Sequence, residues 1–210
     1  VTQARRFGVE ILSPQEATTL RVEGPYKHLT LSDGTEISCH VLMLSMGVSW
    51  TLLPAAGAER FTGAGIYYGA ALSEAANITG ATVYLVGAGN SAGQAAMFFK
   101  DHAKRVVMLV RGNSLGARMS RYLVDRIEAT PNIDVRLETE IAACHGSDRL
   151  EGLELRSRAS GARETVPAGC LFAFLGAAPR THWLRDAIAC DPGGFILTGP
   201  DLAAFDRLRD

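Results

Sequence analysis

The clearest hydrophobic pattern in the chain is an apolar run that leads into a cluster of glycine and other small residues. Thr82 to Val86 combines β-branched, aromatic and aliphatic side chains, which is typical of a strand buried on both faces. Residues 94–100 (QAAMFFK) have the composition of a helix that packs against such a strand. A second apolar run, 105–110 (RVVMLV), predicts another buried strand. We therefore expect two neighbouring parallel strands joined by a helix.

The first fifty residues alternate short hydrophobic runs with turn signals. Residues 1–8 have the basic last turn and glycine stop of a helix end. Strands are expected at 9–12, 16–23, 26–31, 35–39 and 41–46, the last of them apolar and buried. The sequence Ser32-Asp33-Gly34 predicts a hairpin turn between two of them. Residues 48–65 contain Pro54 and several glycines with little periodicity, which indicates a crossover loop.

The remaining pattern predicts a helix before the glycine cluster and a second strand-rich region after it. Helices are expected at 66–78 and 118–128. Strands are expected at 134–138, 150–157, 164–166, 171–176 and within 191–197. Two of these, 150–157 and 164–166, are expected to form a hairpin at the edge of a sheet. Each half of the chain would then have a β-meander followed by an apolar run that ends in glycine. The pattern predicts an α/β protein of two domains.

The glycine cluster has the form of a dinucleotide-binding fingerprint. Gly87-Ala88-Gly89-Asn90-Ser91-Ala92 reads G-x-G-x-x-A between a predicted strand and a predicted helix. Gly87 would permit the tight turn, Gly89 would let the backbone approach a pyrophosphate, and Ala92 would let helix and strand pack closely. Asn90 and Ser91 would donate to the pyrophosphate or cap the helix. The alternative is a βα turn with a structural role alone.

Composition narrows the classes of partner. The 210 residues are 47% hydrophobic and 20% charged with a formal net charge of −1, which gives no reason to expect nucleic acid or a membrane surface as a partner. No apolar run is long enough to span a bilayer and no signal peptide is recognisable, so a cytoplasmic location is expected. The cysteines, Cys39, Cys144, Cys170 and Cys190, have neither C-x-x-C nor metal-ligand spacing. We expect no metal site.

The order of several segments resembles the thioredoxin-reductase-like branch of the flavin-dependent pyridine nucleotide-disulfide oxidoreductases. The segments are VLMLSMG, GIYYGAALSEA, VYLVGAGNSAG, VVMLVRG, SRYLVDRI and LFAFLGAAPRT. The resemblance implies a Rossmann-like three-layer FAD/NAD(P)-binding fold. Residues 1–53 would be part of an FAD-binding domain, 54–178 the NAD(P)H-binding domain, and 179–210 the start of the returning FAD-domain segment. The chain would be an interior portion of that fold, because the two flavin pyrophosphate motifs of the family are not found in it.

The resemblance also locates a departure from the family. Alignment on Gly65-Ile66 places Gly69 and Leu72 where thioredoxin reductases carry the two cysteines of the redox C-x-x-C. Disulfide reduction needs a thiolate and a resolving thiol, so it is not expected at these positions. No catalytic residue is identified. Three functions stay open: a NADPH-dependent FAD oxidoreductase without the dithiol, a flavin reductase that donates to a ferredoxin-type partner, and a non-catalytic nucleotide-binding or regulatory module.

The choice of nucleotide depends on the end of the second strand. NAD-selective sites place an acidic residue there, whereas this chain has Arg111, with Arg118 or Arg121 as a later cation. An arginine suits the 2′-phosphate of NADPH, so NADPH is favoured over NADH; ordinary surface arginines are the alternative. By resemblance Gly176 begins the G-x-x-P-x-T return to the FAD domain, and Tyr67 and Tyr68 would lie near the flavin or belong to the core. FAD is expected in the complete fold, the electron acceptor is unknown, and a homodimer is kept open.

Overall fold

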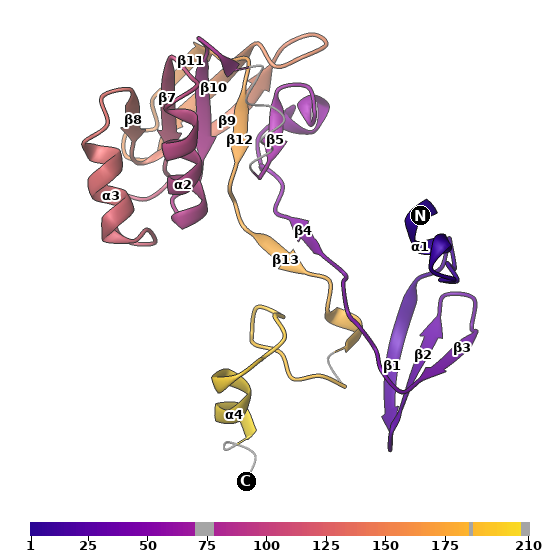
Figure 1. Cartoon of the computed structure of the whole chain (residues 1–210). Helices are drawn as coiled ribbons and strands as arrows, with labels where there is room; N and C mark the ends of the chain where they lie inside the picture. The colour runs from indigo at the N-terminus through magenta and orange to yellow at the C-terminus, as the bar shows by residue number, and fades with distance from the viewer. Residues whose placement is uncertain (70–77, 185–186, 207–210) are drawn as a thin grey trace. The chain divides into compact units, whose positions relative to one another are not determined.

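The computed structural model describes residues 1–69, 78–184 and 187–206, and the chain divides into two compact units (Figure 1). One consists of Val1–Ser49 with Ala177–Asp210, and the other is Trp50–Gly176. The boundaries expected from the sequence fell after residues 53 and 178, against 49 and 176 for these units. The ligand that each unit serves stays a prediction.

The unit Trp50–Gly176 is built on a five-stranded parallel sheet. The strand order is β5 (Ile66–Tyr68), β12 (Leu171–Ala173), β6 (Thr82–Val86), β7 (Arg105–Leu109) and β8 (Ile133–Arg136). The expected parallel pairing of β6 and β7 is confirmed, with Val83 opposite Val106 and Leu85 opposite Met108. The chain runs from β6 toward β8 in one direction, while β12 and β5 lie on the other side of β6. The direction of winding therefore changes at β6.

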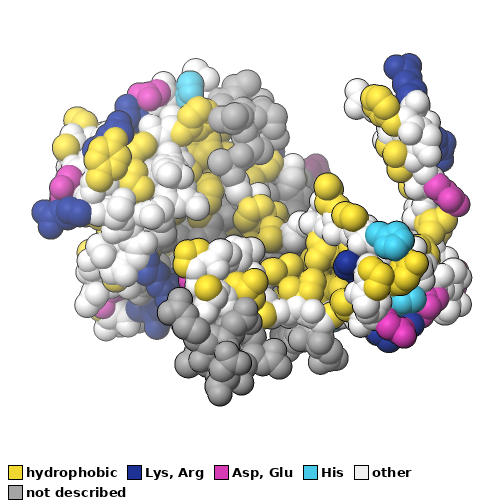
Figure 2. Space-filling view, turned by 60° about the horizontal axis from the view of Figure 1, so that its bottom comes forward, with side chains coloured by type: hydrophobic (Ala, Val, Ile, Leu, Met, Phe, Trp, Pro, Cys, Tyr) yellow, Lys and Arg dark blue, Asp and Glu magenta, His cyan; other side chains and the backbone are white. Residues whose placement is uncertain are grey.

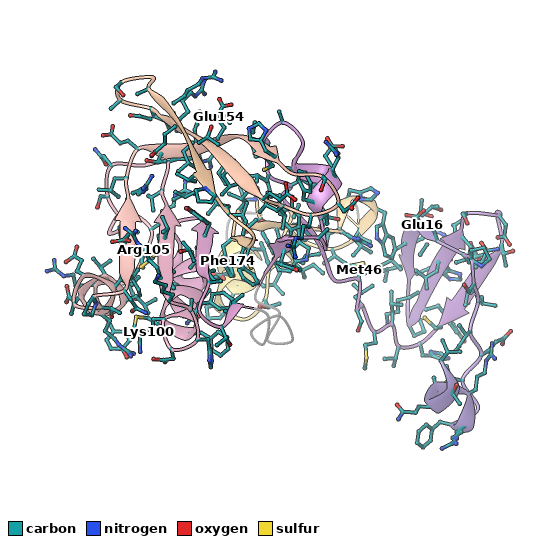
Figure 3. All side chains as sticks on the ribbon, turned by 90° about the horizontal axis from the view of Figure 1, so that it is seen from above. Glu16, Met46, Lys100, Arg105, Glu154 and Phe174 are labelled. Atoms are coloured by element: carbon teal, nitrogen blue, oxygen red, sulfur yellow. The ribbon has the colours of Figure 1, made fainter. Side chains whose placement is uncertain are left out.

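Both faces of this sheet are buried, as the uninterrupted apolar strands predict. Val83, Leu85 and Met108 face α2 (Asn90–Phe99) and α3 (Arg121–Glu128) in one core cluster. Tyr84 and Leu109 face a second cluster. That cluster is covered by the antiparallel meander β9 (Thr139–His145), β10 (Gly152–Ser157) and β11 (Arg163–Pro167), and by the 3-10 helix η1 (Ala58–Phe61). The result is three layers, and Figure 3 shows Glu154 on the meander side and Lys100 on the helix side of the sheet.

The other unit contains the N-terminal meander and the C-terminal segment. Its elements are α1 (Thr2–Arg6), β1 (Ala17–Glu23), β2 (Tyr26–Leu31), β3 (Glu36–Cys39), the 3-10 helix η3 (His182–Leu184) and α4 (Pro200–Asp206). Strands β1, β2 and β3 form an antiparallel sheet. The predicted turn between β2 and β3 is confirmed, because the Thr35 N–H donates to Asp33 Oδ1 over 2.9 Å. Two further strands, β4 (Val48–Trp50) and β13 (Ala177–Pro179), pair with each other.

Several expected elements are wrong, and most of them are apolar runs without a partner strand. Residues 9–12 and 41–46 form no strand, and within 191–197 the pairing is a single bridge between Cys190 and Ile196. Val41 and Met43 are 83% and 86% exposed rather than buried. A strand needs a neighbour for its backbone groups, and no described strand pairs with residues 41–46. Exposed hydrophobic side chains of the N-terminal segment are seen in yellow on the right of Figure 2.

The segment before the glycine cluster also differs from expectation. Ile66–Tyr68 is strand β5, paired with β12, rather than the start of a helix. Its β-branched and aromatic residues suit a strand, and this preference outweighs their near-helical spacing. The rest of that expected helix, 70–77, lies outside the described residues. Strand β9 and helix α4 were not expected, and α3 begins at Arg121 instead of residue 118. None of the helices in the described parts of the chain is long and apolar enough to span a bilayer.

Candidate functional site

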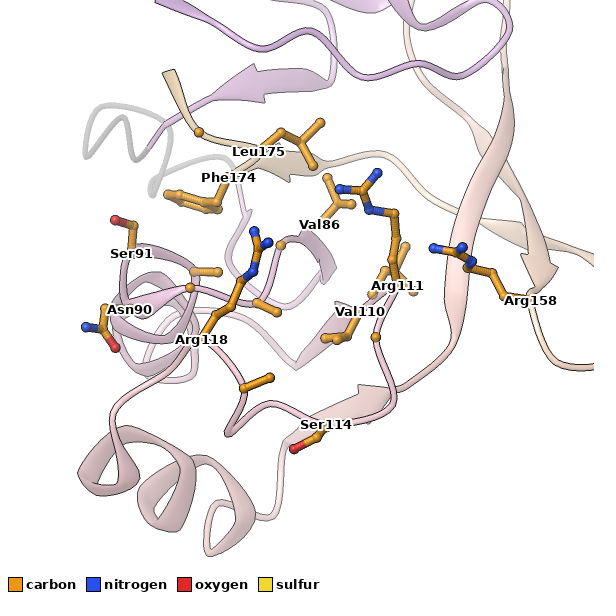
Figure 4. Close-up of a pocket in the computed structure, with 18 of the residues that line it drawn as sticks. Val86, Asn90, Ser91, Val110, Arg111, Ser114, Arg118, Arg158, Phe174 and Leu175 are labelled. Atoms are coloured by element: carbon orange, nitrogen blue, oxygen red, sulfur yellow. The ribbon is translucent and has the colours of Figure 1, made fainter. Parts of the chain in front are cut away.

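A cleft of about 710 Å³ opens where the carboxyl ends of three parallel strands meet (Figure 4). The residues that follow β6, β7 and β12 line it, in the stretches 86–92, 109–112 and 174–176. Ligands of open α/β sheets bind in the crevice at the carboxyl ends of the strands, where the winding reverses. Because the winding of this sheet changes at β6, the cleft has the position of such a crevice.

The glycine-rich turn forms the floor of the cleft, and its two glycines have different structural roles. Gly87 has a φ of +138°, and a Cβ there would lie 2.6 Å from the carbonyl oxygen of Phe174. Any side chain at this position would strain the backbone and collide with Phe174, the residue that follows β12. A Cβ at Gly89 would meet no protein atom within 4 Å, so the space above it is open. The fold needs a glycine at position 87, whereas the open space at Gly89 is available to a ligand.

Helix α2 begins directly after this turn and directs its first N–H groups toward the cleft. The N-cap residue is Gly89, which has no side chain to cap the helix. The first intrahelical hydrogen bond runs from the Gly93 N–H to the Gly89 carbonyl. The N–H groups of the first turn have no intrahelical acceptor, which favours an anion. Ala92 is fully buried, consistent with close packing of helix and sheet.

The side chain of Asn90 has a role that was not expected. Its Oδ1 accepts a hydrogen bond of 2.8 Å from the Ser120 N–H, so it does not cap α2. This bond ties the loop after β7 to the start of α2. Ser91 is exposed at the rim of the cleft, as Figure 4 shows. No side-chain hydrogen bond caps the start of α2, and donation to a pyrophosphate stays a prediction for both residues.

Three arginines line the cleft. Arg111 follows β7, Arg118 lies in the loop before α3, and Arg158 follows β10. In the described residues, neither Arg111 nor Arg118 has a side-chain hydrogen bond or ion pair. Most other arginines of this unit have a carboxylate partner: Arg105, Arg121, Arg136, Arg156 and Arg163. The cleft therefore contains two guanidinium groups, those of Arg111 and Arg118, that have no partner in the described residues and are open to an anion.

The far wall of the cleft follows β12. Phe174, Leu175 and Gly176 lie there, with Trp50 beside them. Gly176 has a φ of +91°, so a glycine is favoured at this return of the chain. Gly69 does not line the cleft; a Cβ there would lie 3.5 Å from the Trp50 ring. Leu72, the other position aligned with a family cysteine, lies outside the described residues.

The two tyrosines of β5 are structural in the described part of the chain. The Tyr67 ring packs against Phe172 with 5.3 Å between ring centroids. The Tyr68 hydroxyl accepts a hydrogen bond from the Leu53 N–H over 3.1 Å. Neither tyrosine lines the cleft. These contacts favour the hypothesis that the two side chains belong to the core over the hypothesis that they lie beside a ligand.

None of the four cysteines is in a disulfide. Burial raises the pKa of the Cys144 thiol to about 11. A thiol with a raised pKa is a poor nucleophile at neutral pH. In the described residues no three histidine, cysteine or acidic side chains gather as metal ligands.

Sequence reasoning missed several lining residues, among them Trp50, Phe174 and Arg158. Trp50 and Phe174 stand next to motifs that were recognised, and their aromatic character was the available signal. Arg158 gave no local signal, because it reaches the cleft through the fold of the meander.

Comparison with known proteins agrees with this geometry. Residues 2–204 match the family described as pyridine nucleotide-disulphide oxidoreductase. Thioredoxin reductase of Streptomyces clavuligerus is 29% identical over 194 residues, which are 92% of this chain and 59% of that protein. The bifunctional thioredoxin reductase/thioredoxin of Mycobacterium leprae is 26% identical over 93% of this chain and 42% of its own length. The chain thus spans about half the length of these relatives.

Solved structures show the same fold. Thioredoxin reductase from Streptococcus pyogenes superimposes with a TM-score of 0.80 at 23% identity, over 95% of this chain and 64% of that one. Thioredoxin reductase from Giardia duodenalis gives 0.82 at 22% identity, over 94% and 64%. These likenesses confirm the expected Rossmann-like α/β fold with its β-meanders. The chain belongs to the pyridine nucleotide-disulphide oxidoreductase family, in its thioredoxin-reductase-like branch.

Proposed function

We propose that this chain contains the nucleotide-binding part of a flavin-dependent oxidoreductase that takes hydride from NADPH. The observation that carries the proposal is the cleft at the carboxyl ends of β6, β7 and β12, with open space above Gly89. When bound, NADPH supplies the hydride, and the FAD of the complete fold accepts it. The units Trp50–Gly176 and Val1–Ser49 with Ala177–Asp210 would be the NAD(P)H-binding and part of the FAD-binding domain.

The residues of the cleft fit a dinucleotide. The first-turn N–H groups of α2 and the Cβ-free backbone at Gly89 suit a pyrophosphate. Arg111 follows β7, where the ribose of the adenosine half is held in this class of fold. Its guanidinium has no carboxylate partner in the described residues, and it would bind the 2′-phosphate that distinguishes NADPH from NADH. Arg118 would add a second positive charge.

The second step of the family reaction would differ in this protein. Gly69 and Leu72 stand at the expected cysteine positions, and the chain contains no C-x-x-C. Without a dithiol at these positions, electrons from the flavin would pass to another acceptor, and we assign no catalytic residue in this chain.

The test is an anaerobic reduction of the purified full-length protein. Flavin absorbance that is bleached by NADPH, and more slowly by NADH at equal concentration, would support the proposal. A protein that binds neither flavin nor nucleotide would contradict it, and a protein that binds nucleotide without reducing flavin would favour a non-catalytic nucleotide-binding module.

A further inference from the structure

We infer that Arg158 is a second determinant of nucleotide choice, which binds the 2′-phosphate together with Arg111 from a different layer of the fold. The inference rests on the proposed function and deepens it. Arg111 belongs to the end of a parallel strand, whereas Arg158 belongs to the antiparallel meander, yet both line the same cleft. Figure 4 shows the Arg158 side chain extending toward Arg111, on the side of Arg111 away from Asn90 and Ser91.

Backbone hydrogen bonds hold the two arginines in a fixed relationship. The Arg158 N–H donates to the Glu138 carbonyl over 2.7 Å, and the Glu138 N–H donates to the Gly112 carbonyl over 2.9 Å. The Thr139 N–H in turn donates to the Val110 carbonyl over 3.0 Å. Arg158 is therefore linked to the residues on both sides of Arg111. These bonds are between backbone groups, so they fix the point from which each arginine side chain extends into the cleft.

The residue at the centre of this network is strained. Glu138 has a φ of +50°, and it is the one residue other than glycine with a positive φ in the described parts of the chain. Strained backbone of this kind persists only where the surrounding structure holds it in place. Here the strained residue turns the chain from β8 into β9 and accepts the hydrogen bond from Arg158.

The charges around Arg158 leave it able to bind an anion. Its nearest carboxylate oxygen is Glu140 Oε2, 3.9 Å from its Nε, and Glu140 also pairs more closely with Arg156. Half of the Arg158 side chain is exposed, at 51%. Arg111 has no carboxylate partner in the described residues. Two guanidinium groups that face one cavity repel each other, and a doubly charged phosphate between them would relieve that repulsion.

Position along the cleft favours the 2′-phosphate over the pyrophosphate as the group that Arg158 binds. The pyrophosphate would lie at the glycine turn and α2, and Arg158 lies on the far side of Arg111 from both (Figure 4). The group closest to Arg158 would therefore be the 2′-position of the adenosine ribose. NADH has a hydroxyl there, so Arg158 should distinguish the two nucleotides.

Arg136 provides a matched control. It lies at the end of β8 and pairs with Glu164, but it lines neither the cleft nor the neighbouring cavity of about 550 Å³, which shares Arg111 with the cleft. Arg158→Gln, Arg158→Lys and Arg136→Gln would each be titrated with NADPH and NADH at fixed ionic strength, with thermal unfolding to check the fold. A second titration would use 2′,5′-ADP, which carries the 2′-phosphate without the nicotinamide.

We expect Arg158→Gln to weaken NADPH and 2′,5′-ADP about three- to tenfold, since the contact is charge-assisted but partly exposed. NADH affinity should stay within about twofold, Arg158→Lys should recover part of the loss, and Arg136→Gln should leave the affinity for both nucleotides unchanged. An unchanged ratio of NADPH to NADH affinity in Arg158→Gln, or an equal loss in Arg136→Gln, would overturn the inference while leaving the proposed function intact. A wild-type protein that binds no nucleotide would overturn both.

Discussion

A Cβ at Gly87 would lie 2.6 Å from the carbonyl oxygen of Phe174, so the glycine turn and the end of β12 pack backbone against backbone. This contact fixes the floor of the cleft against its far wall. Two residues further, at Gly89, the same construction meets open space and an ordinary φ of −88°. Of the two glycines of this motif, Gly87 is required by the fold, and Gly89 leaves the space that we propose for the ligand.

The first prediction separates these two roles by stability. Gly87→Ala should lower the free energy of unfolding by about 1–3 kcal/mol, because the added Cβ meets a backbone atom and the φ of +138° is unfavourable for alanine. Gly89→Ala should stay within about 0.5 kcal/mol of the wild type. Denaturant unfolding of both variants tests this. Equal stability of Gly87→Ala and the wild type would show that the turn is not packed as described.

The second prediction concerns the choice between nucleotides at Arg111. Arg111→Ala should weaken NADPH about tenfold and leave NADH nearly unchanged, because a charge-assisted hydrogen bond contributes about 1.5–3 kcal/mol and exposure reduces that value. Titration with both nucleotides at one salt concentration measures the difference. Arg105→Ala is the control, because the Arg105 side chain pairs with Asp134 of β8 and neither residue lines the cleft. Equal losses for NADPH and NADH would assign Arg111 to a shared part of the nucleotide.

The third prediction concerns the Asn90 side chain. Asn90→Ala should loosen the loop after β7, because the Ser120 N–H loses its acceptor. We expect a loss of about 1 kcal/mol in stability and faster amide exchange at Ser120. Ser91→Ala, which changes an exposed neighbour, should have no such effect. Unchanged exchange at Ser120 in Asn90→Ala would contradict this tie.

The fourth prediction follows from the buried Cys144. Burial raises its pKa from the ordinary 9.0 to about 11, so at pH 8 only about a thousandth of this thiol is ionised. Iodoacetamide should modify Cys39 before Cys144 in the native protein, and mass spectrometry of the peptides reads out the order. After unfolding in guanidinium both should react. Modification of Cys144 at the rate of Cys39 in the native state would contradict its burial.

The same pKa sets the sign of a pH effect on stability. The folded state disfavours the Cys144 thiolate, so its contribution is fully present below pH 9 and is lost as the pH rises from 9 toward 11. The free energy of unfolding of the wild type should fall over this window more steeply than that of Cys144→Ala, when both are measured by denaturant unfolding. Parallel curves for the two proteins would rule out this contribution.

The sequence pattern predicted a strand or helix correctly where the elements that bury it are its neighbours along the chain. Strands β6 and β7, helix α2 and the glycine turn follow from apolar runs and motif spacing, because each is buried by the elements next to it in the chain. Residues 41–46 have an equally apolar pattern but no described strand pairs with them. The exposure of residues 41–46 could not be predicted from their hydrophobic pattern, because it depends on whether another strand pairs with them.

The candidate site shows the same division. Gly87, Gly89 and Arg111 were identified because they lie within a motif or at the end of a strand. Arg158 was not, since its place in the cleft depends on the Glu138 turn and on two backbone hydrogen bonds between segments distant in sequence. Such long-range placement has no counterpart in local residue pattern.

The most direct test of the central claim, that the cleft binds a dinucleotide, is a titration of the wild type and Gly89→Val with NADPH. Position 89 has the backbone of an extended residue and free space, so valine should leave the melting temperature within a few degrees. Its side chain would fill the space proposed for the pyrophosphate. We predict saturable binding by the wild type and at least a hundredfold loss in the folded variant. Equal NADPH affinity of the two proteins would contradict the account.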